Sequence, residues 1–328
     1  MRRTAEVSRR DPVPDPELST AERVKTFEEF QETFTEEQAR YSANRCLDCG
    51  GCSECRECVK ACPADAVDLV RMGRLETLEV GSVIVSTGFK LFDPHDKPIY
   101  GYGKFPNVIT AMQMDRLLSP TRPFNHVVRP SDGKQPDNIA FVMCAGSRDR
   151  QAGTPLCSRV CCMYSLKQAQ LIMGSVPLAD ITIYYIDIRA FGKGYDEFYE
   201  QARGMGVYFV NGKVGRIEPA RDGNLKLFYE DFTGGGTNTA EHDLVVLSVG
   251  LLPDREALAF FKEGNLKTDD FAFVLETDSE LEPGQTSIKG VYVAGAASAP
   301  RDIPDSILHA GAASALAAAH VERMWKKR

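Results

Sequence analysis

The chain has 328 residues, a formal net charge of −7 at pH 7, 43% apolar residues and 26% charged residues. These are ordinary values for a globular protein, and the length suits two or three domains. The acidic balance, without a basic stripe interleaved with aromatic residues, argues against nucleic-acid binding and favours protein partners.

No targeting or membrane-spanning segment is recognisable in the sequence. Met1-Arg2-Arg3 is followed by polar residues and prolines in place of the apolar stretch that a twin-arginine signal requires. A run of about 18 apolar residues, the length that spans a bilayer, occurs nowhere. We therefore expect a soluble, cytoplasmic chain without a transmembrane segment.

The first 45 residues predict an N-terminal extension that ends in a short helix. Residues 1–20 are rich in Pro, Asp and Arg and lack an apolar period, which indicates a linker or a strap laid over a partner. Thr35 and Gln38 have the spacing of a capping box. This spacing predicts a helix from Glu36 into Arg45, directly before the first cysteine.

Ten cysteines fall in two tight groups. The first group contains Cys-x2-Cys-x2-Cys-x3-Cys-Pro, the spacing by which bacterial ferredoxins bind 4Fe-4S clusters. Disulfides and structural zinc are the alternatives, but zinc needs only four thiolates. We therefore expect a ferredoxin-type module over residues 46–75. Its six candidate ligands are Cys46, Cys49, Cys52, Cys55, Cys58 and Cys62.

The first group can serve one cluster or two. Cys52, Cys55 and Cys58 form the core that all ferredoxin arrangements share. In two-cluster ferredoxins the cysteine before proline binds the other cluster, so Cys62 could join Cys46 and Cys49 in a second set that needs a fourth ligand.

A β-branched segment, Leu78–Gly88, predicts a buried parallel strand after this module. It stops at Thr87-Gly88, where glycine permits a tight turn or the close approach of a ligand. Residues 90–135 are rich in Gly, Pro and Asp and indicate a connecting segment, with one helical patch around Ile109–Leu118.

The remaining chain predicts an α/β fold with parallel sheets. Strands 138–144 and 180–187 with helix 165–173 form one βαβ unit. The later expected elements are helix 198–205, strand 207–210, a hairpin with residues 225–228 and a turn at 233–237, buried strands 243–250 and 290–295, and an Ala-rich helix 307–325.

Two sets of motifs resemble known flavoproteins. The three strand ends at Gly88, Gly250 and Gly295 occur in the order seen in flavoproteins of the thioredoxin reductase type. Over roughly residues 46–322 the chain also resembles the A subunit of heterodisulfide reductase. This second resemblance rests on Cys144–Asp149, Cys157–Lys167, Tyr185–Gly194 and Pro300–Pro304.

The resemblance implies a ferredoxin-like iron-sulfur module followed by Rossmann-type domains of a FAD/NAD-linked reductase, with an incomplete flavin domain. It implies a flavin-domain strand and connecting segment at 76–135, a middle Rossmann-like domain at 136–242, and a C-terminal flavin segment at 243–328. The implied FAD-binding positions are Thr87, Gly88, Gly250, Gly295, Ala296, Asp302 and Ile303.

By position, the resemblance also assigns a second cluster to Cys144, Cys157, Cys161 and Cys162. A strand end, a loop and the first turn of a helix supply these residues. The vicinal pair is too close for a relaxed disulfide but can reach two irons. In a nicotinamide-binding domain the same turn would carry the glycines that receive pyrophosphate. The middle domain therefore exchanges a nucleotide site for a cluster.

The sequence departs from the family in the flavin domain. The Gly-x-Gly-x-x-Gly motif and its acidic ribose-binding residue are absent, which implies that a partner chain completes the FAD site. Ala296 stands where common flavoproteins carry an acidic residue, and Asp302 is the nearest substitute. Residues 23–50 resemble ferredoxin segments attached to flavoproteins similar to the small subunit of glutamate synthase.

These features predict an electron-transfer subunit of a multi-subunit anaerobic oxidoreductase, with two 4Fe-4S clusters, or three, and FAD shared with a partner chain. The family implies flavin-based electron bifurcation. The expected partners are a flavin-domain half and proteins similar to the B and C subunits of heterodisulfide reductase or to ferredoxin. The alternatives are a flavin-free iron-sulfur wire and a free-standing pyridine nucleotide-disulfide oxidoreductase, against which the missing glycine motif argues.

Other polar residues give weaker signals. Asp187, Arg189 and Lys193 follow the second strand of the βαβ unit and are either a functional group or solvated charges. His309 and His320 are interpreted as surface or packing residues.

Overall fold

The computed structural model describes residues 13, 14, 16–26, 29–45, 59, 62–67, 77–119, 126–255, 259, 261 and 266–326. The chain divides into two compact units, Met1–Glu76 with Pro120–Pro123 and Thr77–Ser119 with Phe124–Arg328. Among the described residues, no helix combines the length and apolar character needed to cross a membrane.

The described residues of the first unit contain two short helices, α1 (Thr20–Arg23) and α2 (Glu36–Arg45). The expected helix at Glu36–Arg45 is confirmed, together with its cap. The Thr35 amide donates to Gln38 Oε1 at 2.8 Å, and the Gln38 amide donates to Thr35 Oγ1 at 3.3 Å. These reciprocal bonds satisfy two amides that a helix start otherwise leaves without partners.

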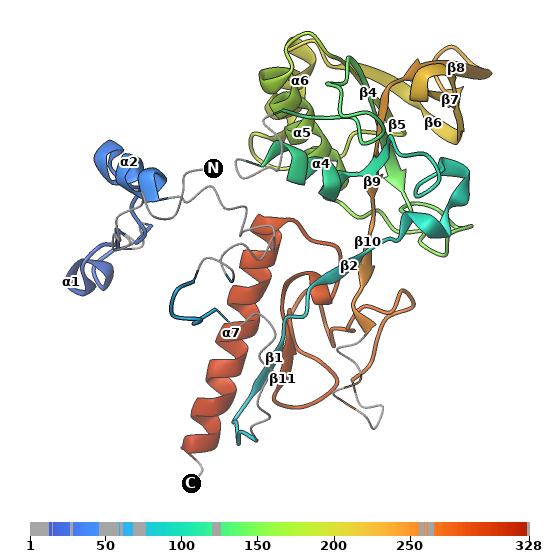
Figure 1. The fold of residues 1–328 in the computed structure, drawn as a ribbon. Coiled ribbons are helices and arrows are strands. Elements are labelled where there is room, and N and C mark those ends of the chain that lie inside the picture. The colour runs from blue at the N-terminus through green and yellow to red at the C-terminus, as the bar shows by residue number, and fades with distance from the viewer. Residues whose placement is uncertain are drawn as a thin grey trace. The chain divides into compact units, whose positions relative to one another are not determined.

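A seven-stranded sheet dominates the second unit and confirms the α/β class (Figure 1). Its strand order is β3-β9-β4-β5-β6-β7-β8, parallel from β3 to β6 and antiparallel from β6 to β8. The strands are β3 (Val108–Thr110), β4 (Asn138–Ala145), β5 (Asp180–Tyr185), β6 (Tyr208–Pro219), β7 (Leu225–Asp231), β8 (Thr237–His242) and β9 (Leu244–Val249).

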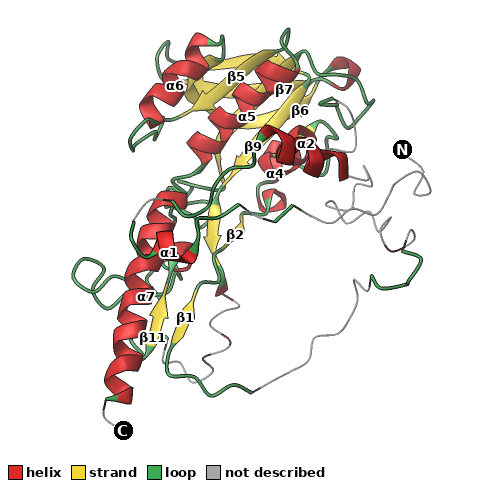
Figure 2. Ribbon diagram, turned by 90° about the vertical axis from the view of Figure 1, so that its left-hand side faces the viewer, coloured by secondary structure: helices red, strands yellow, loops and turns green. Residues whose placement is uncertain are grey.

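Both faces of this sheet are buried at its central strands β4 and β9, as the continuous apolar run of β4 predicted. Ile139 and Phe141 pack toward helices on one face, while Ala140 and Val142 pack into a second cluster on the other. The helices of the first face lie side by side (Figure 2). They are α4 (Ala111–Leu118), α5 (Cys161–Ser175) and α6 (Tyr195–Gly204).

Two further strand pairs complete the second unit. β1 (Val83–Val85) pairs in parallel with β11 (Val291–Val293), and the closing helix α7 (Ile303–Trp325) packs along both (Figure 1). β2 (Phe89–Leu91) pairs antiparallel with β10 (Leu251–Pro253). Short 3₁₀ turns lie at η3 (Pro94–Asp96), η4 (Pro98–Tyr100), η5 (Arg221–Gly223) and η7 (Gly295–Ala297).

Three expectations differ from the observed elements. The strand expected across 78–88 is limited to Val83–Val85, and only Val85 in it is buried. β3 and α4 lie in the expected connecting segment 76–135, yet β3 forms an edge of the large sheet. β9 was expected with the C-terminal flavin segment but pairs with β3 and β4, because an apolar run does not specify its sheet partner.

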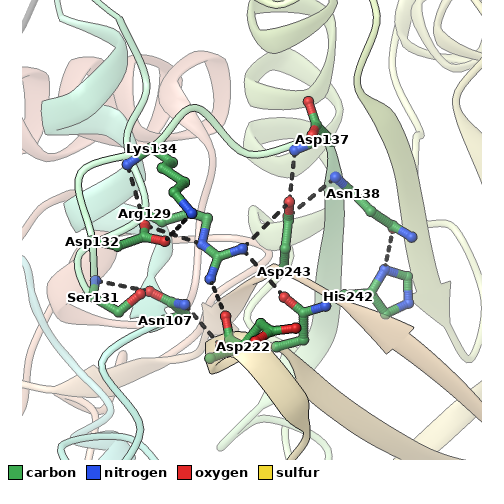
Figure 3. A network of polar contacts seen from close by, with 12 residues as sticks. Asn107, Arg129, Ser131, Asp132, Lys134, Asp137, Asn138, Asp222, His242 and Asp243 are labelled. Atoms are coloured by element: carbon green, nitrogen blue, oxygen red, sulfur yellow. Dashed lines mark hydrogen bonds and ion pairs between the residues drawn. The ribbon is translucent and has the colours of Figure 1, made fainter.

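A buried polar network fixes the edge at which β4 and β9 begin (Figure 3). The Asp243 carboxylate accepts the amides of Asp137 at 2.7 Å and Asn138 at 3.1 Å. Arg129 lies 4.0 Å from the same carboxylate and donates to the Asp222 carbonyl at 2.7 Å. The network therefore joins the loop after residue 126, the η5 turn and two strands of the sheet.

His242, at the end of β8, is a buried neutral imidazole. Its Nδ1 lies 2.6 Å from Asn138 Oδ1, and its Nε2 lies 2.9 Å from the Tyr184 hydroxyl. The amide oxygen can only accept, so Nδ1 carries the proton and Nε2 accepts from Tyr184. Burial lowers the pKa of His242 from 6.5 to about 4.

We expect acid to destabilise the fold through His242. Between pH 6.5 and about 4 the unfolded chain binds a proton that the folded chain excludes. The free energy of unfolding should therefore fall across this window by up to about 3 kcal/mol, and this contribution is fully present above pH 6.5. Urea unfolding of wild type and His242→Gln, followed by circular dichroism, checks this. A variant that keeps the same slope as wild type over this window would contradict the assignment.

Candidate iron-sulfur and flavin site

The second cysteine group (Cys144, Cys157, Cys161 and Cys162) is assembled from three elements. Cys144 lies near the end of β4, Cys157 lies in the following loop, and Cys161 and Cys162 open α5. Three of the side chains are buried and Cys157 is half-buried. Burial raises the pKa of Cys144 to about 11, and the neighbouring Cys162 and Cys157 contribute to the rise. The thiols are therefore close enough to interact electrostatically.

The loop between Cys144 and Cys157 has a defined conformation. Asp149 and Thr154 exchange two backbone hydrogen bonds of 2.9 Å each, and the Arg148 amide donates to the Leu156 carbonyl at 2.8 Å. The Asp149 carboxylate also forms a buried ion pair with Lys97. These contacts hold the loop against the body of the second unit, so that Cys157 returns toward the end of β4.

Backbone amides point at two of the sulfurs. The Arg159 amide donates to Cys157 Sγ at 3.3 Å, and the Arg189 amide donates to Cys162 Sγ at 3.4 Å. Cys144 and Arg159 have φ values of 57° and 63°, in the left-handed region that residues other than glycine rarely adopt. Such strained positions concentrate at functional sites.

The donor set fits an iron-sulfur cluster, which is held by cysteine thiolates. Burial raises the pKa of Cys161 well above its usual value, and Cys144 and Cys162 add to the effect. A bound cation would be needed to keep these thiols ionised near neutral pH, because metal binding expels thiol protons. The described residues contain no group of three His, Cys, Asp or Glu side chains placed to hold a metal ion. The four cysteines therefore match an iron-sulfur cluster in the type of donor atom, and not in an arranged metal-binding geometry.

Of the first cysteine group, only Cys62 lies among the described residues. Its sulfur accepts the Ala66 amide at 3.3 Å. This bond, together with one from the Ala64 amide, lowers the pKa of Cys62, so the backbone after the Cys-Pro step favours the thiolate. The remaining members lie outside the described residues: Cys46, Cys49, Cys52, Cys55 and Cys58.

A cavity of about 950 Å³ lies beside the second cysteine group. Arg159 and Val160, the residues between Cys157 and Cys161, form part of its wall. Of the seven predicted flavin-binding positions, Ala296, Asp302 and Ile303 line it. The size and the largely apolar wall suit an organic cofactor. The aromatic lining residues are Phe89, Tyr164, Phe191, Tyr195 and Phe198.

The other four predicted positions do not line this cavity. Thr87 and Gly88 follow β1, and a side chain at Gly88 would meet open space. Close packing explains why position 250 is a glycine, because a Cβ there would lie 2.7 Å from the Gly146 carbonyl and 2.9 Å from Ser158 Oγ. Their neighbours Phe89 and Leu251 do reach the cavity.

Gly295 is held by a buried relay. Its amide donates to His309 Nδ1 at 2.9 Å, so His309 Nε2 carries the proton toward Glu276 Oε2 at 3.0 Å. Although burial acts in the opposite direction, hydrogen bonds from His309 and the Gly284 amide lower the pKa of Glu276 to about 2. His309 is thus a buried packing residue, whereas the sequence left packing and surface positions open.

Asp302 begins the closing helix. Its carboxylate accepts the Asp305 amide at 2.9 Å, and α7 starts at Ile303, four residues before the expected start at Ile307. The helix N-terminus faces the cavity, where Ile303, Pro304 and Ser306 form part of the lining. The positive end of a helix dipole favours anionic groups such as pyrophosphate, although here Pro304 has no amide hydrogen and the Asp305 and Ser306 amides already donate to Asp302.

Basic side chains surround the same cavity. Arg301 Nη2 donates to Glu276 at 2.9 Å and to Ser298 Oγ at 3.1 Å, while its buried Nε has no hydrogen-bond partner among the described residues. Positive charge with unfilled donors favours an anionic ligand. The basic lining residues are Arg159, Lys167, Arg189, Lys193 and Arg301.

Sequence reasoning missed Arg159, Glu276 and Arg301. Arg159 stands inside the motif Cys-Ser-Arg-Val-Cys-Cys, so its place between two predicted ligands was a usable signal. Arg301 stands inside the motif Pro300–Pro304, which was a usable signal in the same way, whereas Glu276 meets Arg301 and His309 only through tertiary contacts and carried no such signal. Asp187 and Arg189 lie together in the structure, where Arg189 Nε donates to Asp187 Oδ1 at 3.3 Å. Arg189 and Lys193 line the cavity, while Asp187 does not line it and also pairs with Arg148 at 2.6 Å.

Solved structures that match the chain in part include thioredoxin reductases. The thioredoxin reductase of T. acidophilum matches 74% of this chain and 66% of its own at 18% identity, with a TM-score of 0.47. The Lactococcus lactis thioredoxin reductase gives the same coverage and TM-score at 16% identity. No family model matches the chain.

Curated relatives are considerably more similar. The A subunit of the H2:CoB-CoM heterodisulfide,ferredoxin reductase of Methanothermobacter marburgensis is 42% identical over 243 residues, 74% of this chain and 37% of the relative. The A subunit of the ferredoxin:CoB-CoM heterodisulfide reductase of Methanosarcina mazei is 43% identical over 235 residues, 71% of this chain and 30% of the relative. The chain thus spans about a third of the length of these relatives. The chain is therefore related to one part of the heterodisulfide reductase A subunit.

Proposed function

We propose that the chain is an electron-transfer subunit of a multi-subunit oxidoreductase, in which electrons pass between 4Fe-4S clusters and FAD. The observation that carries this proposal is the position of the second cysteine group at the wall of the large cavity. Arg159 and Val160 belong both to the cluster loop and to the cavity lining. A cluster and a flavin held there would lie close together, as electron transfer requires. Bifurcation at the flavin remains part of the proposal.

The ten cysteines supply ligands for two clusters, or for three if Cys46, Cys49 and Cys62 serve a separate one. When bound, the clusters accept and release single electrons. The chain itself contributes the thiolates, the amide donors to the sulfurs and the charges around them. These groups set the reduction potential and perform no acid-base chemistry.

FAD would lie against Ala296, Asp302 and Ile303, with its phosphates toward the start of α7. We assign Thr87, Gly88, Gly250 and Gly295 to the same site through the strand ends that carry them. Flavin supplies the step between paired and single electrons. Arg301 and the dipole of α7 would bind and orient it, while the apolar wall excludes water.

A partner chain would complete the flavin domain. Among the described residues, β1 and β11 form a parallel sheet of only two strands, whereas parallel strands are usually buried on both faces. Val83 and Ile84 of β1 remain about 40% exposed. Ile84 also borders a groove beside Ala317, Val321 and Trp325 of α7. This surface suits further strands and a helix from a flavin-domain half.

The names of the relatives support a wider assembly, because they describe A subunits of heterodisulfide reductases and also name ferredoxin. We propose partners similar to the B and C subunits of those enzymes or to ferredoxin, and a cytoplasmic location. We retain the domain limits 1–45, 46–75, 76–135, 136–242 and 243–328 as a proposal, with β9 serving the large sheet although it lies in the last segment.

Metal analysis of the full chain tests the central claim. We expect anaerobically reconstituted protein to contain iron and sulfide, and reduction by dithionite to produce low-temperature EPR signals of reduced 4Fe-4S clusters. A mononuclear zinc site would instead give a metal without redox activity. Zinc as the only metal, with no EPR signal after reduction, would reject the proposal.

A further inference from the structure

Arg159 connects the second cysteine group to the start of α7. Its backbone amide donates to Cys157 Sγ at 3.3 Å. Its guanidinium donates to Asp305 Oδ2 at 2.5 Å and approaches the Pro300 carbonyl at 3.5 Å. One residue therefore contacts a cluster ligand through its backbone and the first turn of α7 through its side chain.

The surroundings hold Arg159 in a conformation that it does not favour on its own. Its φ of 63° lies in the left-handed region, where a side chain other than glycine is strained. The Phe191 ring lies 5.0 Å from the guanidinium carbon and supports it by a cation–π contact. Phe191 and Arg159 both line the large cavity. The arginine thus lies between the cysteines and the cavity.

We propose that Arg159 is a positioning residue that couples the reduction potential of the second cluster to the binding of an anionic cofactor in the cavity. This inference rests on the proposed function, because it requires the cluster and the cofactor. A fixed positive charge beside a cluster stabilises the reduced form, which carries one more electron, and so raises the reduction potential.

The coupling follows from competition for one guanidinium. In the structure Asp305 neutralises part of the Arg159 charge. A phosphate bound at the start of α7 adds negative charge to the same place and so neutralises more of the guanidinium charge that would act on the cluster. Cofactor binding should then lower the cluster potential. By linkage, reduction of the cluster should weaken cofactor binding by the corresponding factor.

Arg148 provides a matched control. Its Nη1 donates to Asp187 Oδ1 at 2.6 Å, and its charge also interacts with the Cys144 thiol. Its partner Asp187 also accepts from Arg189 Nε at 3.3 Å, so this carboxylate keeps a cationic partner when Arg148 is replaced, and Arg148 is not among the residues that line the described part of the cavity. Replacing it therefore changes the charge near the cluster but leaves the connection between Arg159 and α7 in place.

The experiment compares the full chain with its Arg159→Met, Arg159→Lys and Arg148→Met variants after anaerobic reconstitution with iron and sulfide. Dithionite titration monitored by EPR gives the midpoint potential with and without saturating FAD. The signal of the second cluster is the one that disappears in a Cys161→Ala, Cys162→Ala chain. Circular dichroism establishes that each variant is folded, and Arg159→Lys covers the case in which the methionine variant is not.

The wild-type potential should fall on FAD addition. Arg159→Met should start from a lower potential and show no further fall, and Arg159→Lys should start near wild type with a smaller fall, because lysine keeps the charge but loses the fork that reaches Asp305 and Pro300. Arg148→Met should start lower and keep the wild-type fall. A wild-type fall retained in Arg159→Met, or no fall in wild type, overturns the inference and leaves the cluster standing. Absence of the cluster signal in wild type rejects the proposed function as well.

Discussion

Replacing Cys161 and Cys162 together with alanine should remove one complete cluster from the reconstituted chain. The pair supplies two of four thiolates, and the two that remain, Cys144 and Cys157, cannot hold a 4Fe-4S cluster. The expected loss is about four iron and four sulfide per chain, since a cubane that lacks half its ligands does not persist in water. Iron and sulfide analysis after desalting, with EPR of the reduced protein, measures it.

The matched control is Cys52→Ala with Cys55→Ala, which removes two ligands from the first cysteine group. It should lose iron but keep the EPR signal that the Cys161 and Cys162 variant lacks. If the Cys161 and Cys162 variant keeps the iron content of wild type, the second cluster does not exist. Loss of the same signal in both variants would mean that the two groups share one cluster.

Residues 1–328 expressed alone should retain FAD well below one equivalent. The described part of the cavity provides the start of α7 and a cationic wall, but the glycine motif that receives pyrophosphate in flavoproteins is absent from the sequence. The affinity that remains should depend on Asp302, whose side chain caps α7 and orders its first turn. Loss of an N-cap costs about 1 kcal/mol of helix stability, and because FAD would bind the ordered first turn, its binding should weaken by at most about five-fold.

Flavin fluorescence after anaerobic reconstitution and desalting measures retention, and a titration measures affinity. Asp302→Ala should bind FAD more weakly than wild type. Glu280→Ala, an exposed residue outside the cavity, should bind it equally. Stoichiometric FAD on the lone chain would revive the free-standing flavoenzyme. An absence of binding at saturating FAD, with both clusters intact, would favour the flavin-free wire.

The sequence predicts those elements whose signal is local. β4, α5, β5 and α6 follow from long apolar runs and helical periods, and the α2 cap follows from a spacing of three residues. The fold differs from the sequence prediction where an element forms by pairing with a segment that is distant in the sequence. β3 is three residues long within a segment rich in Gly and Pro, and it becomes a strand because β9 offers it an edge.

In the candidate site, too, the features with a local sequence signal could be predicted and the long-range contacts could not. Cysteine spacing identifies the ligands because short spacings limit geometry directly. The contacts of Arg159 with Asp305 and of His309 with Glu276 join residues that are 146 and 33 positions apart. No periodicity relates such pairs, so they emerge only when the chain is folded.

The paired strands β2 and β10 also limit how the cavity can change shape. The chain passes between the β1–β11 sheet and the seven-stranded sheet through both of them, and they bond to each other with Phe89 opposite Pro253 and Leu91 opposite Leu251. A single linker would act as a free swivel. A two-stranded ribbon resists stretching and yields most readily to twist. Since Phe89 and Leu251 both line the cavity, a twist of this ribbon would move two parts of its wall together.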